Sequence, residues 1–119
     1  MDKLTKIKSA ILKNNGATLT STGEYANIKT GYIVSEEKHG VILSVKEFNN
    51  KSAKYFNMLL KKAYKLGAFL GFWLHNGRVY IDFNKHIKSK SEAIRYAHEQ
   101  KQLAIWDCLN ACEINTTQE

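Results

Sequence analysis

Two apolar, aromatic-rich runs on either side of a polar triplet form the clearest pattern along this chain. The runs cover residues 68–74 and 78–83, and His75, Asn76 and Gly77 stand between them. Asn-Gly between two such runs is a strong local signal for a tight β-hairpin. We therefore predict two neighbouring antiparallel strands joined at Asn76 and Gly77.

Shorter β-branched or apolar runs predict further strands on both sides of this hairpin. They lie at residues 17–21, 31–35, 41–45, 103–107 and 112–114. Because only residues 36–40 separate the second run from the third, we expect those two strands to pair with each other antiparallel.

Apolar residues at helical spacing predict an N-terminal helix within residues 1–15 and a longer helix over 51–66. Asn50 is the expected N-cap of the longer helix, and Gly67 is expected to end it. A third helix follows the hairpin and extends to about Lys101. Its start is marked by Ser89 and Glu92, at the spacing of a capping box.

These elements predict an α+β fold, an antiparallel-rich β-sheet with two to three helices packed against it. The third helix would cross over between the hairpin and the strand at 103–107. A chain of 119 residues without proline has no evident linker, so we expect a single domain over 1–119. Residues 115–119 are polar and are expected to form a frayed tail.

The formal net charge of +7 favours anionic partners such as nucleotides, nucleic acid or acidic proteins. Arg78 and Arg95 are the only arginines, which argues against base-specific reading of DNA more than against phosphate binding. The lysines of 51–66 are typical of a solvated helix face, and an anion-binding stripe is the alternative interpretation.

Sequence motifs give no sign of catalysis. The chain has no Gly-rich dinucleotide motif, no Walker-type loop and no His-Glu-x-x-His. Asp82 and Asp107 would form an acid–base pair if their strands were neighbours, but we favour structural roles for both at strand ends. The four scattered histidines lack metal-ligand spacing. We expect a protein that is not an enzyme and has neither cofactor nor metal.

No apolar run is long enough for a membrane span, and the first residues lack the apolar core of a secretory signal. We therefore expect a cytoplasmic protein that makes no membrane contact. In that compartment Cys108 and Cys112 are expected to be reduced thiols, although a disulfide between them stays open.

Aromatic and charged residues of the predicted sheet form the candidate binding surface. Alternation along the second hairpin strand puts Arg78, Tyr80 and Asp82 on one face. Such a face can stack a base, pair a phosphate and accept hydrogen bonds from a ribose, whereas the alternative is that most of the aromatics fill the core. The start of the third helix offers a further phosphate site. The candidate ligand-binding residues are Trp73, Arg78, Tyr80, Asp82, Arg95, Trp106 and Asp107.

Several segments resemble a family of small phage proteins, the anti-Thoeris "sponges". The resemblance covers roughly residues 31–114. It lies in Gly31-Tyr-Ile-Val-Ser35, Gly71-Phe-Trp-Leu-His-Asn-Gly-Arg-Val-Tyr-Ile-Asp82, Ser91-Glu-Ala-Ile94 and Gln102-Leu-Ala-Ile-Trp-Asp107.

The resemblance implies a phage or prophage anti-defence protein in the cytoplasm of the infected bacterium. Such a protein binds the cyclic ADP-ribose isomer made by a TIR-domain sensor, keeps the immune effector silent, and forms an oligomer built from dimers. The resemblance assigns no individual ligand contact to this chain. Two alternatives remain: a small basic nucleic-acid-binding module, and an inhibitor that docks on an acidic host protein.

Overall fold

The computed structural model describes residues 2–36 and 40–116. Within these ranges the chain forms four helices and seven strands, and every strand pair is antiparallel, so the predicted α+β class is confirmed. The elements are α1 (Lys3–Asn14), β1 (Gly16–Leu19), β2 (Tyr32–Ser35), β3 (Val41–Ser44), α2 (Val45–Asn49), α3 (Ala53–Leu66), β4 (Phe69–His75), β5 (Arg78–Ile87), α4 (Lys90–Glu99), β6 (Ala104–Asp107) and β7 (Cys112–Asn115).

The predicted hairpin is confirmed as β4 and β5, the best-paired strands of the sheet. Asn76 and Gly77 have φ values of 50° and 75°. Two successive residues with positive φ give the tight turn whose twist matches the flanking strands. The sheet order is β1-β4-β5-β2-β6-β7, and β3 also pairs with β5.

The predicted pairing of β2 with β3 is wrong. Both strands pair with the same edge of β5: β3 lies opposite residues 78–81 and β2 opposite residues 84–87. The ten-residue β5, four residues longer than the predicted run, has room for both partners. β2 and β3 are therefore collinear along β5. Residues 36–40 join them without a hairpin, and the part of that loop at 37–39 lies outside the described residues.

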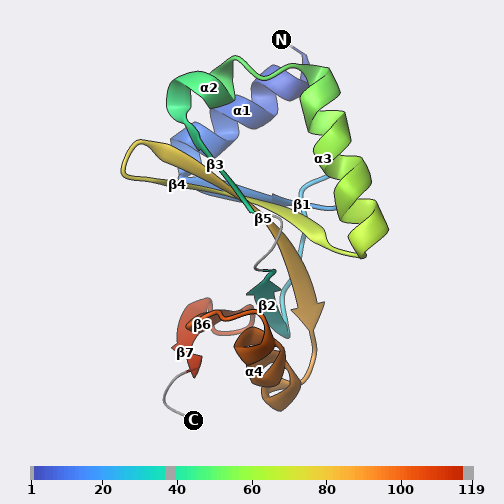
Figure 1. Ribbon diagram of the computed structural model, residues 1–119, viewed down its shortest axis with the longest axis vertical. Helices are drawn as coiled ribbons and strands as arrows, with labels where there is room; N and C mark the ends of the chain where they lie inside the picture. The colour runs from blue at the N-terminus through green and yellow to red at the C-terminus, as the bar shows by residue number, and fades with distance from the viewer. Residues whose placement is uncertain (1, 37–39, 117–119) are drawn as a thin grey trace.

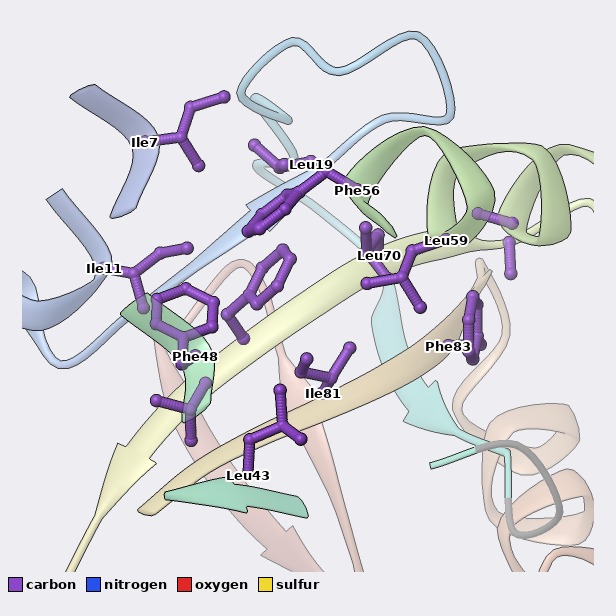
Figure 2. Packing of buried hydrophobic residues seen from close by; sticks show 14 residues of the cluster. Ile7, Ile11, Leu19, Leu43, Phe48, Phe56, Leu59, Leu70, Ile81 and Phe83 are labelled. Atoms are coloured by element: carbon purple, nitrogen blue, oxygen red, sulfur yellow. The ribbon is translucent and has the colours of Figure 1, made fainter. Parts of the chain in front are cut away.

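All four helices cover one face of the sheet, where two hydrophobic clusters lie. The larger cluster is packed beneath α1, α2 and α3 (Figure 2) and includes Phe48, Phe56, Phe72 and Ile81, each at most 5 % exposed. The rings of Phe48 and Phe56 lie 5.8 Å apart, as do those of Phe56 and Phe72. Contacts of this kind between large buried rings contribute strongly to a core.

The smaller cluster lies under α4. Val34 of β2 is opposite Lys85, on the same face as Phe83, and it packs with Ile105 and with the Ala93 and Ala97 side of α4. The predicted crossover is thereby confirmed, because α4 links β5 to β6 with β2 between them.

The molecule is elongated, with extents of 44 × 28 × 26 Å. Figure 1 shows α1, α2 and α3 together near the N-terminus, and α4 with β6 and β7 at the other end. We call the first part, with β1, β3 and β4, the large half, and the second, with β2, the small half. β5 runs through both.

Several predicted boundaries need correction. Asn50 does not cap α3 but ends α2, a helix that was not predicted, and Ser52 accepts the N–H of Tyr55 in its place. A complete capping box lies at Ser44 and Glu47, which is why the predicted strand 41–45 stops at Ser44.

Other termini agree more closely with the sequence. Gly67 ends α3 with φ 64°, as predicted, and Ser89 accepts the N–H of Glu92 at the start of α4. The predicted tail begins too early. Asn115 belongs to β7, and Thr116 is 1 % exposed and donates its hydroxyl hydrogen to the Gln102 carbonyl. Residues 117–119 of the predicted tail lie outside the described residues. None of the helices in 2–36 and 40–116 has the length and apolar character needed to cross a membrane.

Candidate binding site on the open face of the sheet

The open face, which we define as the face of the sheet away from the helices, carries most of the predicted site residues. Leu70 and Phe72 of β4 are buried toward the helices, so Gly71 and Trp73 between and beyond them point the other way. The register places Gly71 opposite Asp82 and Trp73 opposite Tyr80. The same alternation puts Arg78 of β5 on this face.

A hollow of about 540 Å³ lies on this face between the two halves. The large half lines it with Thr18, Gly71 and Trp73. The small half contributes Ser35 of β2, Gln102 before β6, Trp106 of β6 and Glu113 of β7. The strand β5 contributes Asp82 and Asn84. A volume of this size is in the range of small-molecule sites.

The two tryptophans of the chain line this one hollow, Trp73 from the large half and Trp106 from the small half. Their exposed fractions are 54 % and 45 %, so both side chains are partly accessible to solvent. Trp73 also stacks on His75, with ring centroids 5.1 Å apart, and lies 6.0 Å from the ring of Tyr80. Exposed, fixed aromatic rings of this kind are suited to stacking a planar ligand.

The floor of the hollow carries polar groups that the sequence did not indicate. Ser35 donates its hydroxyl hydrogen to Oδ1 of Asn84 at 2.9 Å, and Asn84 is 7 % exposed. That bond fixes the amide and leaves its Nδ2 as a donor beside Gly71. A Cβ at position 71 would collide with this Nδ2, so the glycine is required there.

Asp82 is the acceptor on this floor. Partial burial raises the pKa of its carboxyl group above the ordinary value. A desolvated carboxyl with a raised pKa is a feature common at functional sites. The Asp82 carboxylate and the Asn84 amide therefore offer an acceptor and a donor side by side between the tryptophans.

Asp107 has the structural role at a strand end that we favoured, and it does not line the hollow as its place among the candidate ligand-binding residues required. Its carboxylate accepts the backbone N–H groups of Leu109 and Asn110 at 3.0 and 3.1 Å, and the Asn110 side-chain amide at 2.8 Å. These bonds lower its pKa, the side-chain bond from Asn110 most of all. Asp107 thus organises the β6–β7 turn. The alternative of an acid–base pair with Asp82 does not arise, because β2 lies between β5 and β6.

The two arginines are also separated. Arg78 lies at the hairpin end of the open face, opposite His75. Arg95 is exposed on α4, which packs on the other face of the sheet. Of the seven candidate residues, the structure brings Trp73, Asp82 and Trp106 together around the hollow. Tyr80 lies beside Trp73, and Arg78 is on the same face but outside the lining. Arg95 and Asp107 lie elsewhere.

Charge and aromatic surface are segregated in this fold. Over residues 2–36 and 40–116, the charged side chains lining the hollow are Asp82 and Glu113, both acidic. Most lysines instead lie on the helices.

The described part of the chain contains no group of three or more His, Cys, Asp or Glu side chains able to hold a metal ion. Cys108 and Cys112 are free thiols near the β6–β7 turn, and burial raises the pKa of the Cys108 thiol. Comparison with known proteins found no match to any family model, to any curated protein or to any solved structure.

Proposed function

We propose that this protein is a non-catalytic binding protein that holds a cyclic ADP-ribose-type nucleotide in the open-face hollow. By lowering the free concentration of that signal it would act as a phage or prophage anti-defence protein against a TIR-based immune system, in the cytoplasm of the infected host. The observation that carries the proposal is the lining of one hollow by both tryptophans over the Asp82–Asn84 floor. The sequence resemblance to anti-Thoeris sponges supports the choice of ligand.

Different side chains of the hollow would contact different parts of the ligand. The adenine would stack on Trp73 or Trp106, since an indole face can stack any base. The Asn84 Nδ2 donates to a ring nitrogen, and the Asp82 carboxylate accepts from an exocyclic amine or a ribose hydroxyl. The pyrophosphate lies toward Arg78, the basic group on the same strand and face. Arg95 and Asp107 have no part in this site.

A sponge needs affinity and not turnover. A nanomolar Kd corresponds to about −12 kcal/mol, which a nucleotide-sized ligand reaches only with stacking, charge pairing and a site held rigid before binding. The Ser35–Asn84 hydrogen bond and the Trp73–His75 stack provide such rigidity. Assembly from dimers is part of the proposal because the sequence resemblance implies it.

Isothermal titration with cyclic ADP-ribose isomers tests the proposal, followed by heating of the complex and analysis of the released ligand. We expect tight binding of one isomer and recovery of that ligand intact. Trp73→Ala and Trp106→Ala should each weaken binding about fivefold or more, given that stacking contributes about 1–3 kcal/mol per base. Tyr64→Ala removes a more exposed aromatic, 75 % accessible, on α3 and should leave nucleotide binding unchanged.

Two outcomes would reject the proposal. Absence of binding heat with every isomer would remove the ligand class, and recovery of a hydrolysed product would make the protein an enzyme. Sedimentation with and without ligand checks the dimer-based assembly separately.

A further inference from the structure

The longest stretch without an acidic residue lies between Glu47 and Asp82, and α3 is at its centre. The inner side of α3 buries Phe56, Leu59 and Ala63 against the sheet. Its outer side carries Lys54, Lys61, Lys62 and Lys65 around a shallow depression that also includes Asn57 and Met58. The helix therefore presents a concentrated positive face to solvent.

The lysines of this chain differ in what engages their ammonium groups. Lys8 donates to the Asn49 carbonyl at 3.0 Å and also to the Lys51 carbonyl, while Lys85 donates to the Leu66 carbonyl and lies 3.8 Å from the Glu36 carboxylate. These two lysines hold helix ends in place. Lys62 lies over the Phe83 ring, with 5.4 Å from Nζ to the ring centroid.

Lys54, Lys61 and Lys65 have no such contact. Among residues 2–36 and 40–116, their ammonium groups meet neither a carboxylate within ion-pair distance nor a hydrogen-bond acceptor, and all three side chains are exposed. Nothing in the described structure offsets their mutual repulsion. An external polyanion would do so.

The spacing of these three lysines suits a phosphate backbone. Positions 54, 61 and 65 fall on one side of a helix, and the eleven steps from the first to the last rise about 16 Å. That length covers about five phosphates of one strand, at a rise of about 3.4 Å per nucleotide along the duplex axis. Three phosphate contacts along this face are therefore geometrically compatible.

The composition of the face favours nucleic acid over an acidic protein. Protein–protein interfaces are enriched in arginine and aromatic residues and depleted in lysine. The outer side of α3 has lysine without arginine, and Met58 is the sole large apolar side chain in its depression. Lysine acts as a point charge on phosphate and does not read bases bidentately.

We propose that the outer face of α3, formed by Lys54, Lys61 and Lys65, binds the phosphate backbone of nucleic acid without reading its sequence. This face lies on the helical side of the sheet, and the hollow lies on the open side, so the two sites do not overlap. Nucleic acid would localise the protein, and the hollow would remain available to a small ligand.

Fluorescence anisotropy with a labelled 20-base-pair DNA duplex of mixed sequence tests the inference. With three phosphates contacted, log Kd should vary with log salt with a slope of about 2.7, which weakens binding about 40-fold between 50 and 200 mM salt. A duplex of a second sequence should bind equally. The triple substitution Lys54→Gln, Lys61→Gln, Lys65→Gln should remove this binding and its salt dependence.

The matched control is Lys13→Gln, Lys29→Gln, Lys88→Gln, which removes the same charge from exposed lysines outside this face. It should keep most of the affinity and the full slope. Far-UV circular dichroism should show α3 intact in the first variant, because glutamine is nearly as good a helix former as lysine.

Three results would overturn the inference. They are equal weakening by both triple variants, absence of duplex binding at 50 mM salt, and binding to polyglutamate or anionic vesicles in preference to the duplex. Nucleotide titration of the α3 variant keeps this test separate from the proposed function. If the α3 variant loses duplex binding but binds the nucleotide as before, the nucleic-acid site on α3 is supported independently of the hollow. If the unmodified protein binds the duplex but no nucleotide, the proposed function fails and the α3 inference stands.

Discussion

The large and small halves of this sheet differ in the size of their hydrophobic cores. Within the described residues, the large half buries fourteen hydrophobic residues, several of them aromatic, whereas the small half buries five, two of which are alanines. The small half also has polar contacts between its elements. Tyr96 donates to the Glu36 carboxylate at 3.2 Å, and His98 and the Thr116 carbonyl are 3.0 Å apart.

The contrast matters because the candidate site needs both halves. Trp73 belongs to the large half and Trp106 to the small half, and β5 is the strand that connects them. Local stability follows the number of buried apolar contacts. The small half should therefore open first, and any ligand that contacts both tryptophans should stabilise it.

The largest expected effect comes from the large half. Phe48 is 0 % exposed and its ring lies 6.0 Å from that of Phe72, so Phe48→Ala leaves a cavity under α2. We expect a loss of about 3–5 kcal/mol in the free energy of unfolding, measured by urea denaturation. Phe48→Leu should lose clearly less. Equal losses for the two variants would mean that the ring is not packed as described.

The second effect belongs to the small half. Ile105 is 2 % exposed in a small cluster whose partly buried neighbours can relax, so Ile105→Ala should lose about 2 kcal/mol. Amide hydrogen exchange should speed up in β2, β6, β7 and α4 and stay slow in β1 and β4. A uniform increase across all strands would show that the halves open as one unit.

The third effect concerns the β6–β7 turn. Hydrogen bonds hold the pKa of Asp107 below its ordinary value, so its stabilising effect is full above the unfolded pKa of about 3.9 and is lost as the pH falls through the folded pKa. Asp107→Ala should lower the urea midpoint at pH 7 by less than Ile105→Ala does. The urea midpoints of Asp107→Ala and the unmodified protein should lie closer together at pH 3 than at pH 7. An equal gap at both pH values would contradict the role given to this carboxylate.

The smallest effect has the opposite sign. Burial raises the pKa of Asp82, so the charged carboxylate costs stability as the pH rises through its folded pKa. Asp82→Asn should therefore raise the urea midpoint slightly at pH 7, with no gain below about pH 4. The same variant should weaken nucleotide binding. A destabilised variant with unchanged binding would assign Asp82 to structure alone.

The sequence predicted the elements whose signals are local. Asn76-Gly77 fixes its turn through two positive φ values, and Gly67 and Ser89 mark helix ends through their own backbone or side-chain chemistry. The β2–β3 pairing could not be predicted in this way. Proximity along the chain favours a hairpin, but the length of β5 allows both strands to pair with it, and that competition is decided by tertiary contacts.

The site was predicted in part for the same reason. Alternation placed Arg78, Tyr80 and Asp82 on one face, and the structure agrees. The floor residue Asn84 and its partner Ser35 lie on strands whose pairing was not predicted. Their hydrogen bond therefore could not be predicted from the sequence. Gly71 opposite Asp82 was an available signal, since a glycine inside a strand often marks a close approach of another group.

The central claim is that one ligand contacts both halves of the open face, and fluorescence of single-tryptophan variants tests it most directly. Trp73→Phe leaves only Trp106, and Trp106→Phe leaves only Trp73. Titration of each variant with the isomer that binds in calorimetry should change the emission of the remaining tryptophan, with the same Kd as the heat signal of that variant. Calorimetric binding in which either tryptophan stays silent would contradict a site that spans the two halves.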